Sequence, residues 1–116
     1  MSIEKRRAPR IPPFVASCRY VQGESRHVGL LTDLSRSGAR LHAEEAAPPE
    51  GSEIVVEVKL GQKATHLRIP GTVRWAKPSP RGGFVFGMSF DGIGPAEQQV
   101  LDEVIEEFRR RAAQLA

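Results

Sequence analysis

The sequence predicts an all-β fold: one closed antiparallel barrel of six or seven short strands, followed by a C-terminal helix. Short segments in which apolar and polar residues alternate follow one another between residues 14 and 90, and glycine-rich turns separate them. No helical pattern interrupts this series. From residue 95 onward, apolar residues recur at intervals of three and four, as they do on one face of a helix. The 116 residues suffice for one domain with one core.

The strands can be placed by their alternation and by the turns that bound them. Gln22-Gly23-Glu24 has the composition of a hairpin turn, and Gly61-Gln62-Lys63 that of another turn. Pro70-Gly71 interrupts the longest β pattern, so we expect a bulge there that bends the sheet. The predicted strands cover residues 14–21, 27–34, 38–43, 53–60, 66–76 and 84–90.

The two ends of the chain differ from the barrel. Residues 1–13 are charged and contain three prolines, so we expect a flexible, extended basic arm there and the barrel over residues 14–94. Residues 95–116 form the amphipathic helix. Two roles for its apolar face stay open: it covers an open end of the barrel, or it pairs with a second copy of the chain. The residues of such a homodimer seam would be Leu101, Val104, Phe108 and Leu115.

The charges are distributed unevenly along the chain. The formal net charge is +3, but residues 1–40 hold eight basic and three acidic residues, a surplus of +5. Residues 41–116 hold nine basic and eleven acidic residues, which leaves −2. Four of the basic residues lie between Lys5 and Arg10. Such a cluster is either a solvated terminus or a binding surface for an anion: a nucleic acid, a nucleotide or a membrane surface.

Composition argues against several classes of protein. The single cysteine, Cys18, cannot form a disulfide or a thiolate metal cluster within one chain. No apolar run approaches the roughly 20 residues needed to cross a bilayer, so we expect a cytoplasmic protein without membrane insertion. The three histidines lack metal-ligand spacing, and no catalytic motif occurs. We therefore expect neither an enzyme nor a protein that holds a metal or a cofactor.

Two short motifs carry the chemistry of a candidate binding site. In the first, Arg6 and Arg10 lie four residues apart, and each guanidinium can bond two acceptors at once, on a phosphate or on guanine. In the second, Asp33, Ser35 and Gly38 lie at a turn between two strands. A carboxylate accepts two hydrogen bonds side by side, which complements the adjacent N1–H and N2–H₂ donors of guanine. The alternative is that Asp33 and Ser35 stabilise the turn itself.

Together and in this order, these motifs resemble the PilZ domain, a bacterial receptor module for cyclic di-GMP. The family pattern is RxxxR on an N-terminal arm followed by [D/N]xSxxG; here these are Arg6 to Arg10 and Asp33 to Gly38. Two further segments are similar: residues 71–75 look like the family's G-x-V-x-W strand, and residues 84–90 look like its closing strand. The resemblance covers roughly residues 5–112 and implies a split, Greek-key type of barrel that ends in a helix.

The resemblance also implies a ligand, cyclic di-GMP, and a role for each matched residue. Arg6 and Arg10 would bind its phosphates and contact its guanines, and Asp33 would bind the Watson–Crick edge of a guanine. Ser35 would contact a phosphate, and Gly38 would shape the turn. Three other residues are weaker candidates for ligand contact: Lys5, Arg7 and Trp75.

Some of these assignments leave alternatives. Trp75 either lines the ligand pocket or belongs to the barrel core with its N–H satisfied. Arg36 occupies a variable position inside the second motif and can simply be solvated. Lys5, which precedes the first motif, leaves open whether one nucleotide or two bind to each chain.

The implied function is that of an adaptor. Cyclic di-GMP would order the basic arm and thereby create a surface for a protein partner, which the sequence does not identify. Such an effector would control motility, surface behaviour including biofilm formation, or exopolysaccharide production. One alternative is a PilZ-type interaction module that does not bind the nucleotide. Another is a small barrel that binds nucleic acid through its arm, but the arm lacks nearby aromatic residues for base stacking, so no nucleic-acid partner is expected.

Overall fold

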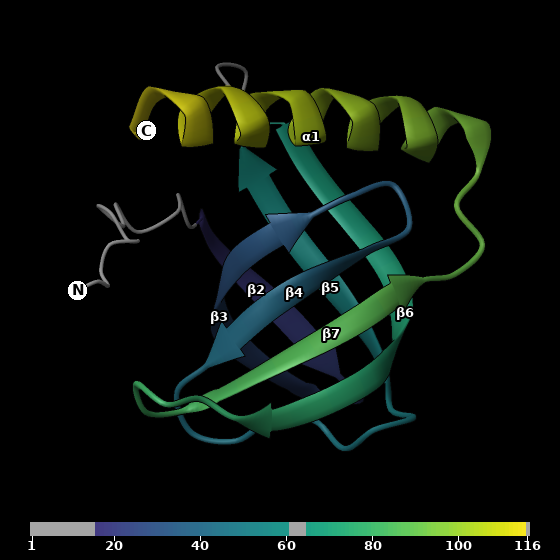
Figure 1. Ribbon diagram of the computed structural model, residues 1–116. Coiled ribbons are helices and arrows are strands. Elements are labelled where there is room, and N and C mark those ends of the chain that lie inside the picture. Colours follow the sequence, from purple (N-terminus) through teal and green to yellow (C-terminus); the bar gives the residue numbers. More distant parts are fainter. Residues whose placement is uncertain (1–15, 61–64, 116) are drawn as a thin grey trace.

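The computed structural model describes residues 16–60 and 65–115. Six antiparallel strands form a closed barrel in the order β2-β3-β4-β7-β6-β5, and one helix follows them (Figure 1). The predicted fold class is therefore confirmed. The predicted basic arm, with Lys5, Arg6, Arg7 and Arg10, lies outside the described residues. The elements are β2 (Ala16–Gln22), β3 (Ser25–Leu34), β4 (Gly38–Ala43), β5 (Glu53–Leu60), β6 (Thr65–Pro78), β7 (Phe84–Phe90) and α1 (Pro95–Leu115).

Two pairings between strands that are distant in sequence close the barrel. β2 pairs with β3 on one side and with β5 on the other, and β4 pairs with β7. β6 is long enough to serve both halves of the wall, because its first part pairs with β5 and its last part pairs with β7. Closure gives each of the six strands a hydrogen-bonded neighbour on both sides.

The bulge predicted at Pro70-Gly71 is wrong. The pairing of β5 with β6 continues in register through Val55–Pro70 and Ile54–Gly71. Proline removes a backbone donor but not an acceptor, and the Pro70 carbonyl accepts a hydrogen bond from the amide of Asp91 at 2.9 Å. The register shifts lie elsewhere: one falls between Leu31 and Asp33 on β3, and the other between Val73 and Trp75 on β6.

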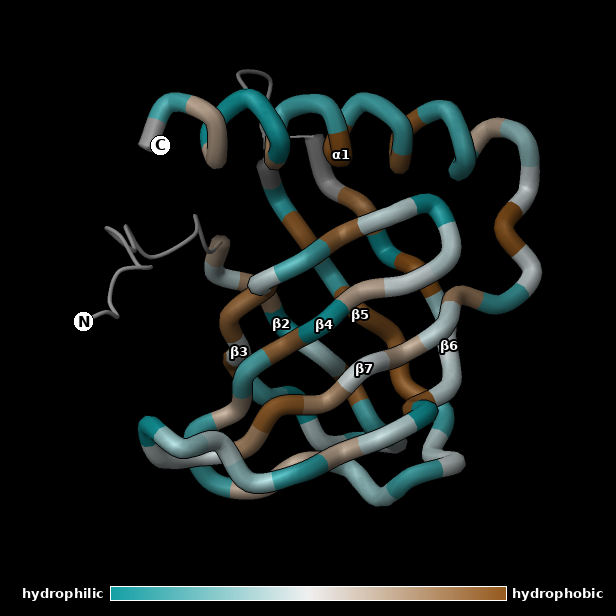
Figure 2. Tube along the Cα trace, viewed as in Figure 1, coloured by the Kyte–Doolittle hydropathy of each residue, from teal (hydrophilic) through white to brown (hydrophobic). Residues whose placement is uncertain are grey.

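The core fills the barrel interior with the inward-facing apolar residues of all six strands. Figure 2 shows hydrophobic and hydrophilic positions alternating along the strands. Burial of one large apolar side chain stabilises the fold by about 1.5–3 kcal/mol relative to leaving it exposed. Tyr20 is also buried and meets Phe86 edge to face at 5.2 Å between ring centroids. The largest fully buried side chains are Phe86, Leu31, Leu41, Ile69, Leu101, Val56, Val58, Val73 and Val104.

Cys18 belongs to this core and is 5% exposed. Burial raises the pKa of its thiol to about 12, because the apolar interior disfavours the thiolate. The thiol therefore stays protonated at neutral pH, and a protonated, enclosed thiol is not a nucleophile.

Helix α1 lies across one end of the barrel, where it contacts β6 and β5 (Figure 1). Its hydrophobic positions face the barrel (Figure 2), and Leu101, Val104, Ile105 and Phe108 are buried. The helix thus covers the barrel end, as the first of the two predicted roles requires. A homodimer seam through Leu101, Val104 and Phe108 would require α1 to leave its own barrel. Within the described residues, no helix combines the length and apolar character needed to cross a membrane.

The flank of α1 carries a compact ion-pair group. Glu107, with 11% of its side chain exposed, accepts hydrogen bonds from Arg110 and from Arg111, the latter at 2.7 Å. The hydrogen bond from Arg111 is the main reason that the pKa of the Glu107 carboxyl is lowered. These i,i+3 and i,i+4 ion pairs stabilise the C-terminal turns of α1, near the end of the segment that packs against the barrel.

Candidate ligand site

A hollow of about 370 Å³ lies on the outer surface of the barrel, where the β3–β4 turn meets β4, β6 and β7. The hollow contains four of the residues predicted from sequence: Asp33, Ser35, Gly38 and Trp75. The other four predicted residues belong to the arm and lie outside the described part of the chain. The full lining is Asp33, Ser35, Ser37, Gly38, Ala39, Arg40, Arg74, Trp75, Gly87, Met88 and Ser89.

A bulge in β3 turns Asp33 toward this hollow. Leu31 pairs with Leu41, but the next pair is Asp33 with Arg40, so Thr32 is an extra residue on β3. The Thr32 hydroxyl donates to the Arg40 carbonyl at 3.1 Å, which holds the bulge in place. As a result, Leu31 stays in the core while Asp33 projects outward, opposite Arg40.

The Asp33 carboxylate is 60% exposed and only lightly engaged. Oδ1 accepts a hydrogen bond from the amide of Leu34 at 3.0 Å, which fixes the orientation of the group. Oδ2 lies 3.5 Å from Arg40 Nη2, at the long limit of a hydrogen bond. An exposed ion pair of this kind contributes about 0–1 kcal/mol. A ligand that offers two donors can therefore replace Arg40 at little cost.

Ser35, rather than Asp33, closes the β3–β4 turn. Its backbone amide donates to the Gly38 carbonyl at 2.9 Å. Its hydroxyl oxygen accepts from the Ser37 amide at 3.3 Å and contacts the Gly38 carbonyl at the same distance. These hydroxyl contacts are long for hydrogen bonds, so the hydroxyl can turn toward an incoming acceptor. The turn-stabilising alternative thus applies to Ser35, whereas the Asp33 carboxylate faces solvent.

Two glycines let the walls of the hollow come close together. A Cβ atom at Gly38 would lie 2.2 Å from the Met88 carbonyl oxygen, so a side chain there would force β4 and β7 apart. A Cβ atom at Gly87 would lie 2.4 Å from Trp75 Nε1. The indole therefore lies directly against bare backbone, and the absence of a side chain at Gly87 makes room for it.

A second bulge turns Trp75 outward. Val73 pairs with Met88 and Trp75 with Gly87, so Arg74 is the extra residue on β6. Regular alternation from the buried Val73 would have placed Trp75 in the core. Instead the side chain of Trp75 is 38% exposed and lines the hollow, with Lys77 Nζ 5.6 Å from its ring centroid. The core alternative for Trp75 does not hold in this structure.

Arg40 and Arg74 line the hollow and were not among the predicted site residues. Arg74 Nε donates to Ser89 Oγ at 2.7 Å across the β6–β7 pair, which holds this guanidinium at the rim. The alternation of residues 38–43 already placed Arg40 on the outer face, two residues after Gly38. That alternation could have identified Arg40. Nothing local in the sequence connects Arg74 with the β3–β4 turn, since the pairing of β4 with β7 brings them together.

Arg36 is not merely solvated. Its Nε donates to Asp102 Oδ1 at 3.1 Å, which ties the β3–β4 turn to α1. Gln98 Nε2 also donates to the same oxygen, at 2.9 Å. The turn that carries Asp33 and Ser35 is thus attached to the helix that covers the barrel end.

The hollow combines groups suited to a planar, anionic ligand. It holds one carboxylate, hydroxyls, two guanidinium groups and one indole face. A carboxylate can bind a base edge, guanidinium groups can bind phosphate, and an indole can stack on a base. Among the described residues, no group of three or more His, Cys, Asp or Glu side chains could hold a metal ion.

Comparison with solved structures shows the same fold in several proteins. A PilZ domain of YcgR from Escherichia coli, solved with c-di-GMP, matches with a TM-score of 0.68 and 22% identity, over 92% of this chain and 89% of that chain. The Bacillus subtilis inhibitor of motility MotI/DgrA has a TM-score of 0.68 and 13% identity, over 93% and 52%. A tetrameric PilZ protein from Xanthomonas campestris has a TM-score of 0.59 and 21% identity, over 78% and 49%.

Identities at this level show a shared fold and nothing more specific, and a comparison with curated proteins found no match. The family comparison is more direct. The model of the PilZ domain matches residues 4–107, which include both short motifs, the two bulged strands and most of α1. This span covers nearly the whole chain, and the resemblance first drawn from the motifs is confirmed: the chain belongs to the PilZ domain family.

Proposed function

We propose that this protein is a receptor for cyclic di-GMP that acts as an adaptor and catalyses no reaction. One observation carries the proposal: Asp33, Ser35 and Gly38 share one outer hollow with an exposed indole and two guanidinium groups. The family supports it, because a neighbour with the same fold was solved with c-di-GMP. The hollow is open to solvent, as suits a ligand that the arm or a partner would then cover.

Asp33 is proposed to recognise guanine. Its Oδ1 is oriented by the Leu34 amide, and both oxygens face outward from the β3 bulge. Guanine presents two adjacent donors, N1–H and N2–H₂, on its Watson–Crick edge, whereas adenine has no such pair. Because the competing contact with Arg40 is long and exposed, the exchange for two neutral donors is favourable. This arrangement gives selectivity for guanine over adenine.

Phosphate binding is proposed to come from both the hollow and the arm. Arg40 and Arg74 lie at the hollow's rim, and the Ser35 hydroxyl is free to donate once it leaves its long contacts. Arg6 and Arg10, which match the family's first motif, would supply the remaining charge. The exposed face of Trp75 would stack on a base, and stacking of this kind is worth about 1–3 kcal/mol.

The downstream step is proposed to be binding of a protein partner in the cytoplasm. The notion that this process is motility, biofilm formation or exopolysaccharide production rests on the family and on neighbours such as the B. subtilis inhibitor of motility. No transfer or hydrolysis step is assigned to the site, since no histidine is among the described residues that line it beside the serine hydroxyls.

Calorimetric titration of the full chain with cyclic di-GMP tests the proposal, with cyclic di-AMP, GTP and single-stranded RNA as controls. We expect saturable binding of cyclic di-GMP with Kd below about 100 μM and much weaker binding of the adenine analogue. Asp33→Ala should weaken binding of cyclic di-GMP by about tenfold and reduce the guanine preference. The matched control is Glu24→Ala, an exposed acid on the β2–β3 turn, and it should change nothing.

Two results would favour the alternative functions over cyclic di-GMP binding. Absence of cyclic di-GMP binding with intact circular dichroism would leave a PilZ-type interaction module without a nucleotide. Tight RNA binding that is insensitive to sequence and falls steeply with salt would indicate nucleic-acid binding through the arm.

A further inference from the structure

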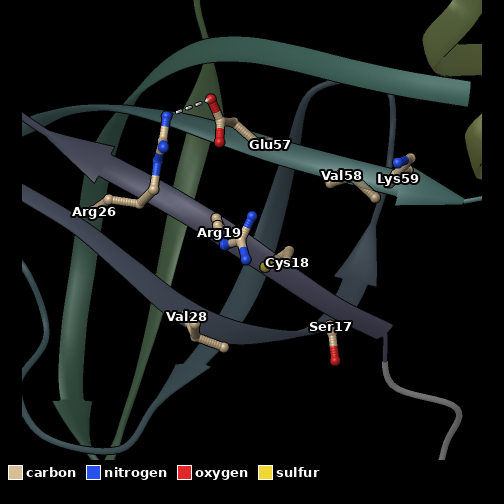
Figure 3. Close-up of a pocket in the computed structure, with 8 residues that line it drawn as sticks. All are labelled: Ser17, Cys18, Arg19, Arg26, Val28, Glu57, Val58 and Lys59. Atoms are coloured by element: carbon tan, nitrogen blue, oxygen red, sulfur yellow. Dashed lines mark ion pairs between the residues drawn. The ribbon is translucent and has the colours of Figure 1, made fainter.

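A second hollow, of about 610 Å³, lies on a different part of the barrel surface, over β2, β3 and β5 (Figure 3). In the barrel order β2-β3-β4-β7-β6-β5, these strands form the half of the wall opposite β4, β7 and β6, which carry the candidate ligand site together with Asp33 at the end of β3. We call this surface the β2–β3–β5 face. Its outward side chains are Ser17, Arg19, Arg26, Val28, Glu57 and Lys59.

The β2–β3–β5 face has a surplus of positive charge. Its one acid, Glu57, has an 11% exposed side chain and is already shared by two arginines, Arg68 at 2.8 Å and Arg26 at 3.7 Å. Figure 3 shows Arg26 reaching across to Glu57 while Arg19 lies between Glu57 and Val28. Among the described residues, neither Arg19 nor Lys59 has an acidic partner. The unneutralised cations therefore favour an anionic occupant.

The face also carries an apolar contact point. Val28 is 67% exposed, the more exposed of the two large hydrophobic side chains found at the surface of the described residues. It pairs directly with Arg19 across β2 and β3, and Arg19 pairs in turn with Glu57 across β2 and β5. The three side chains therefore form one row across the sheet: apolar, cationic, and a neutralised acid.

This combination distinguishes between kinds of anion. A free phosphate or a single carboxylate would use the cations but leave Val28 in water. A single-stranded nucleic acid is bound largely by stacking on aromatic side chains, and none lines this face. A duplex would contact the cations through its phosphates but, like a free phosphate, would leave Val28 in water. An extended acidic peptide uses both features, because an apolar side chain can cover Val28 while flanking carboxylates meet Arg19 and Lys59.

We infer that the β2–β3–β5 face docks an acidic segment of a partner protein, in which one apolar side chain is flanked by carboxylates. This docking does not require nucleotide binding, because the two hollows share no lining residue and can be occupied together. An adaptor of this family would hold its partner through this surface.

The test uses the full chain and a fluorescein-labelled synthetic peptide with one leucine between two pairs of glutamates, measured by fluorescence anisotropy. We expect saturable binding in the range of about 10–300 μM at low salt. Arg19→Glu with Lys59→Glu should weaken binding at least about tenfold, because two attractions become repulsions. The charge-matched control, Arg81→Glu with Arg109→Glu, lies outside the face and should alter it less than about twofold.

Further arms separate docking from general attraction. Val28→Ser keeps every charge and should weaken binding by about threefold or more, and replacement of the peptide's leucine by glycine should do the same. No peptide binding, equal weakening by the charge-matched control, or equal binding of the glycine peptide would each overturn the inference. So would sedimentation showing a dimer that the Arg19/Lys59 variant loses, because the face would then belong to a second copy.

Cyclic di-GMP titration of the Arg19/Lys59 variant keeps this inference distinct from the proposed function. Nucleotide affinity should match that of the unmodified chain, since neither residue lines the candidate ligand site. Loss of peptide binding with retained nucleotide binding supports the docking face alone. The reverse pattern, in an Asp33 variant, supports the ligand site alone.

Discussion

The two halves of the barrel wall are built differently. Where β2 pairs with β3 and β5, the register is unbroken, and each outward residue has an inward neighbour on either side. Where β3 pairs with β4 and β6 with β7, each pairing contains one bulge. Both bulges lie beside the same hollow, and each one turns outward a side chain with binding chemistry: Asp33 on β3 and Trp75 on β6.

The difference shows how the bulged half of one small barrel can separate the residues that stabilise the fold from the residues that face a ligand. In regular pairing, every second residue of a strand points into the core. A residue that points inward cannot contact a ligand on the outer surface. A bulge adds one residue, which breaks this alternation locally without opening the sheet. The bulged half can therefore present Asp33 and Trp75 while Leu31, Leu34 and Val73 remain buried beside them.

A large loss of stability is expected from Gly38→Ala, at the junction of the bulged half. The added methyl group would lie 2.2 Å from a backbone carbonyl oxygen, and backbone cannot move aside as a side chain can. We expect a loss of about 3 kcal/mol in the free energy of unfolding, measured by urea denaturation. The control is Gly23→Ala, where φ is 59° but no atom lies within 4 Å; it should cost about 1 kcal/mol. Equal losses would mean that the close approach of β4 and β7 is not required.

Two substitutions on β6 test whether stability and ligand binding depend on different residues. Ile69 is 1% exposed in the regular part, and Ile69→Ala should cost about 2–5 kcal/mol of stability. The milder Ile69→Val keeps the chain folded for titration and should leave cyclic di-GMP affinity within about twofold. Trp75→Ala should have the opposite profile, with a stability loss of about 1 kcal/mol and an affinity loss of about tenfold or more. If each substitution lowered both the stability and the affinity for cyclic di-GMP, stability and binding would not depend on different residues.

The smallest effect concerns the tie between the bulged half and α1. Arg36 and Asp102 form an exposed pair, with 69% and 49% of their side chains accessible. A double-mutant cycle with alanine at both positions should give a coupling energy of about 0.2–1 kcal/mol, which falls as salt is added. Arg109→Ala, at an exposed position of the same helix, serves as the reference for a cation without this contact. A coupling of zero would show that the turn and the helix are energetically independent.

The regular features of the fold could be predicted from the sequence. The bounds of β4, β5 and β7 agree with the predicted ranges 38–43, 53–60 and 84–90, because glycines, prolines and turn residues enclose clear alternation. β3 begins two residues before its predicted range, and β6 begins one residue before its range and ends two residues after it. Strand ends depend on partners elsewhere in the sheet, so a local pattern places them less well.

The bulges could not be predicted in this way. Their extra residues, Thr32 and Arg74, are ordinary strand residues, and a register shift depends on the partner strand rather than on local composition. Pro70-Gly71 looked like a bulge because proline lacks a donor, yet a missing donor does not add a residue. Asp33, Ser35 and Gly38 were found through their motif, whereas Arg74 and the outward direction of Trp75 required the assembled sheet.

The candidate site lies across a seam between two hairpins. The β3–β4 hairpin supplies Asp33, Ser35 and Arg40, the β6–β7 hairpin supplies Arg74 and Trp75, and only the non-local pairing of β4 with β7 joins them. Non-local strand pairings form slowly because the loop between them must close first. A ligand held across this seam would act as a clamp on the step that opens the barrel. Bound ligand would slow unfolding, so the lifetime of the folded chain would increase with the concentration of the ligand.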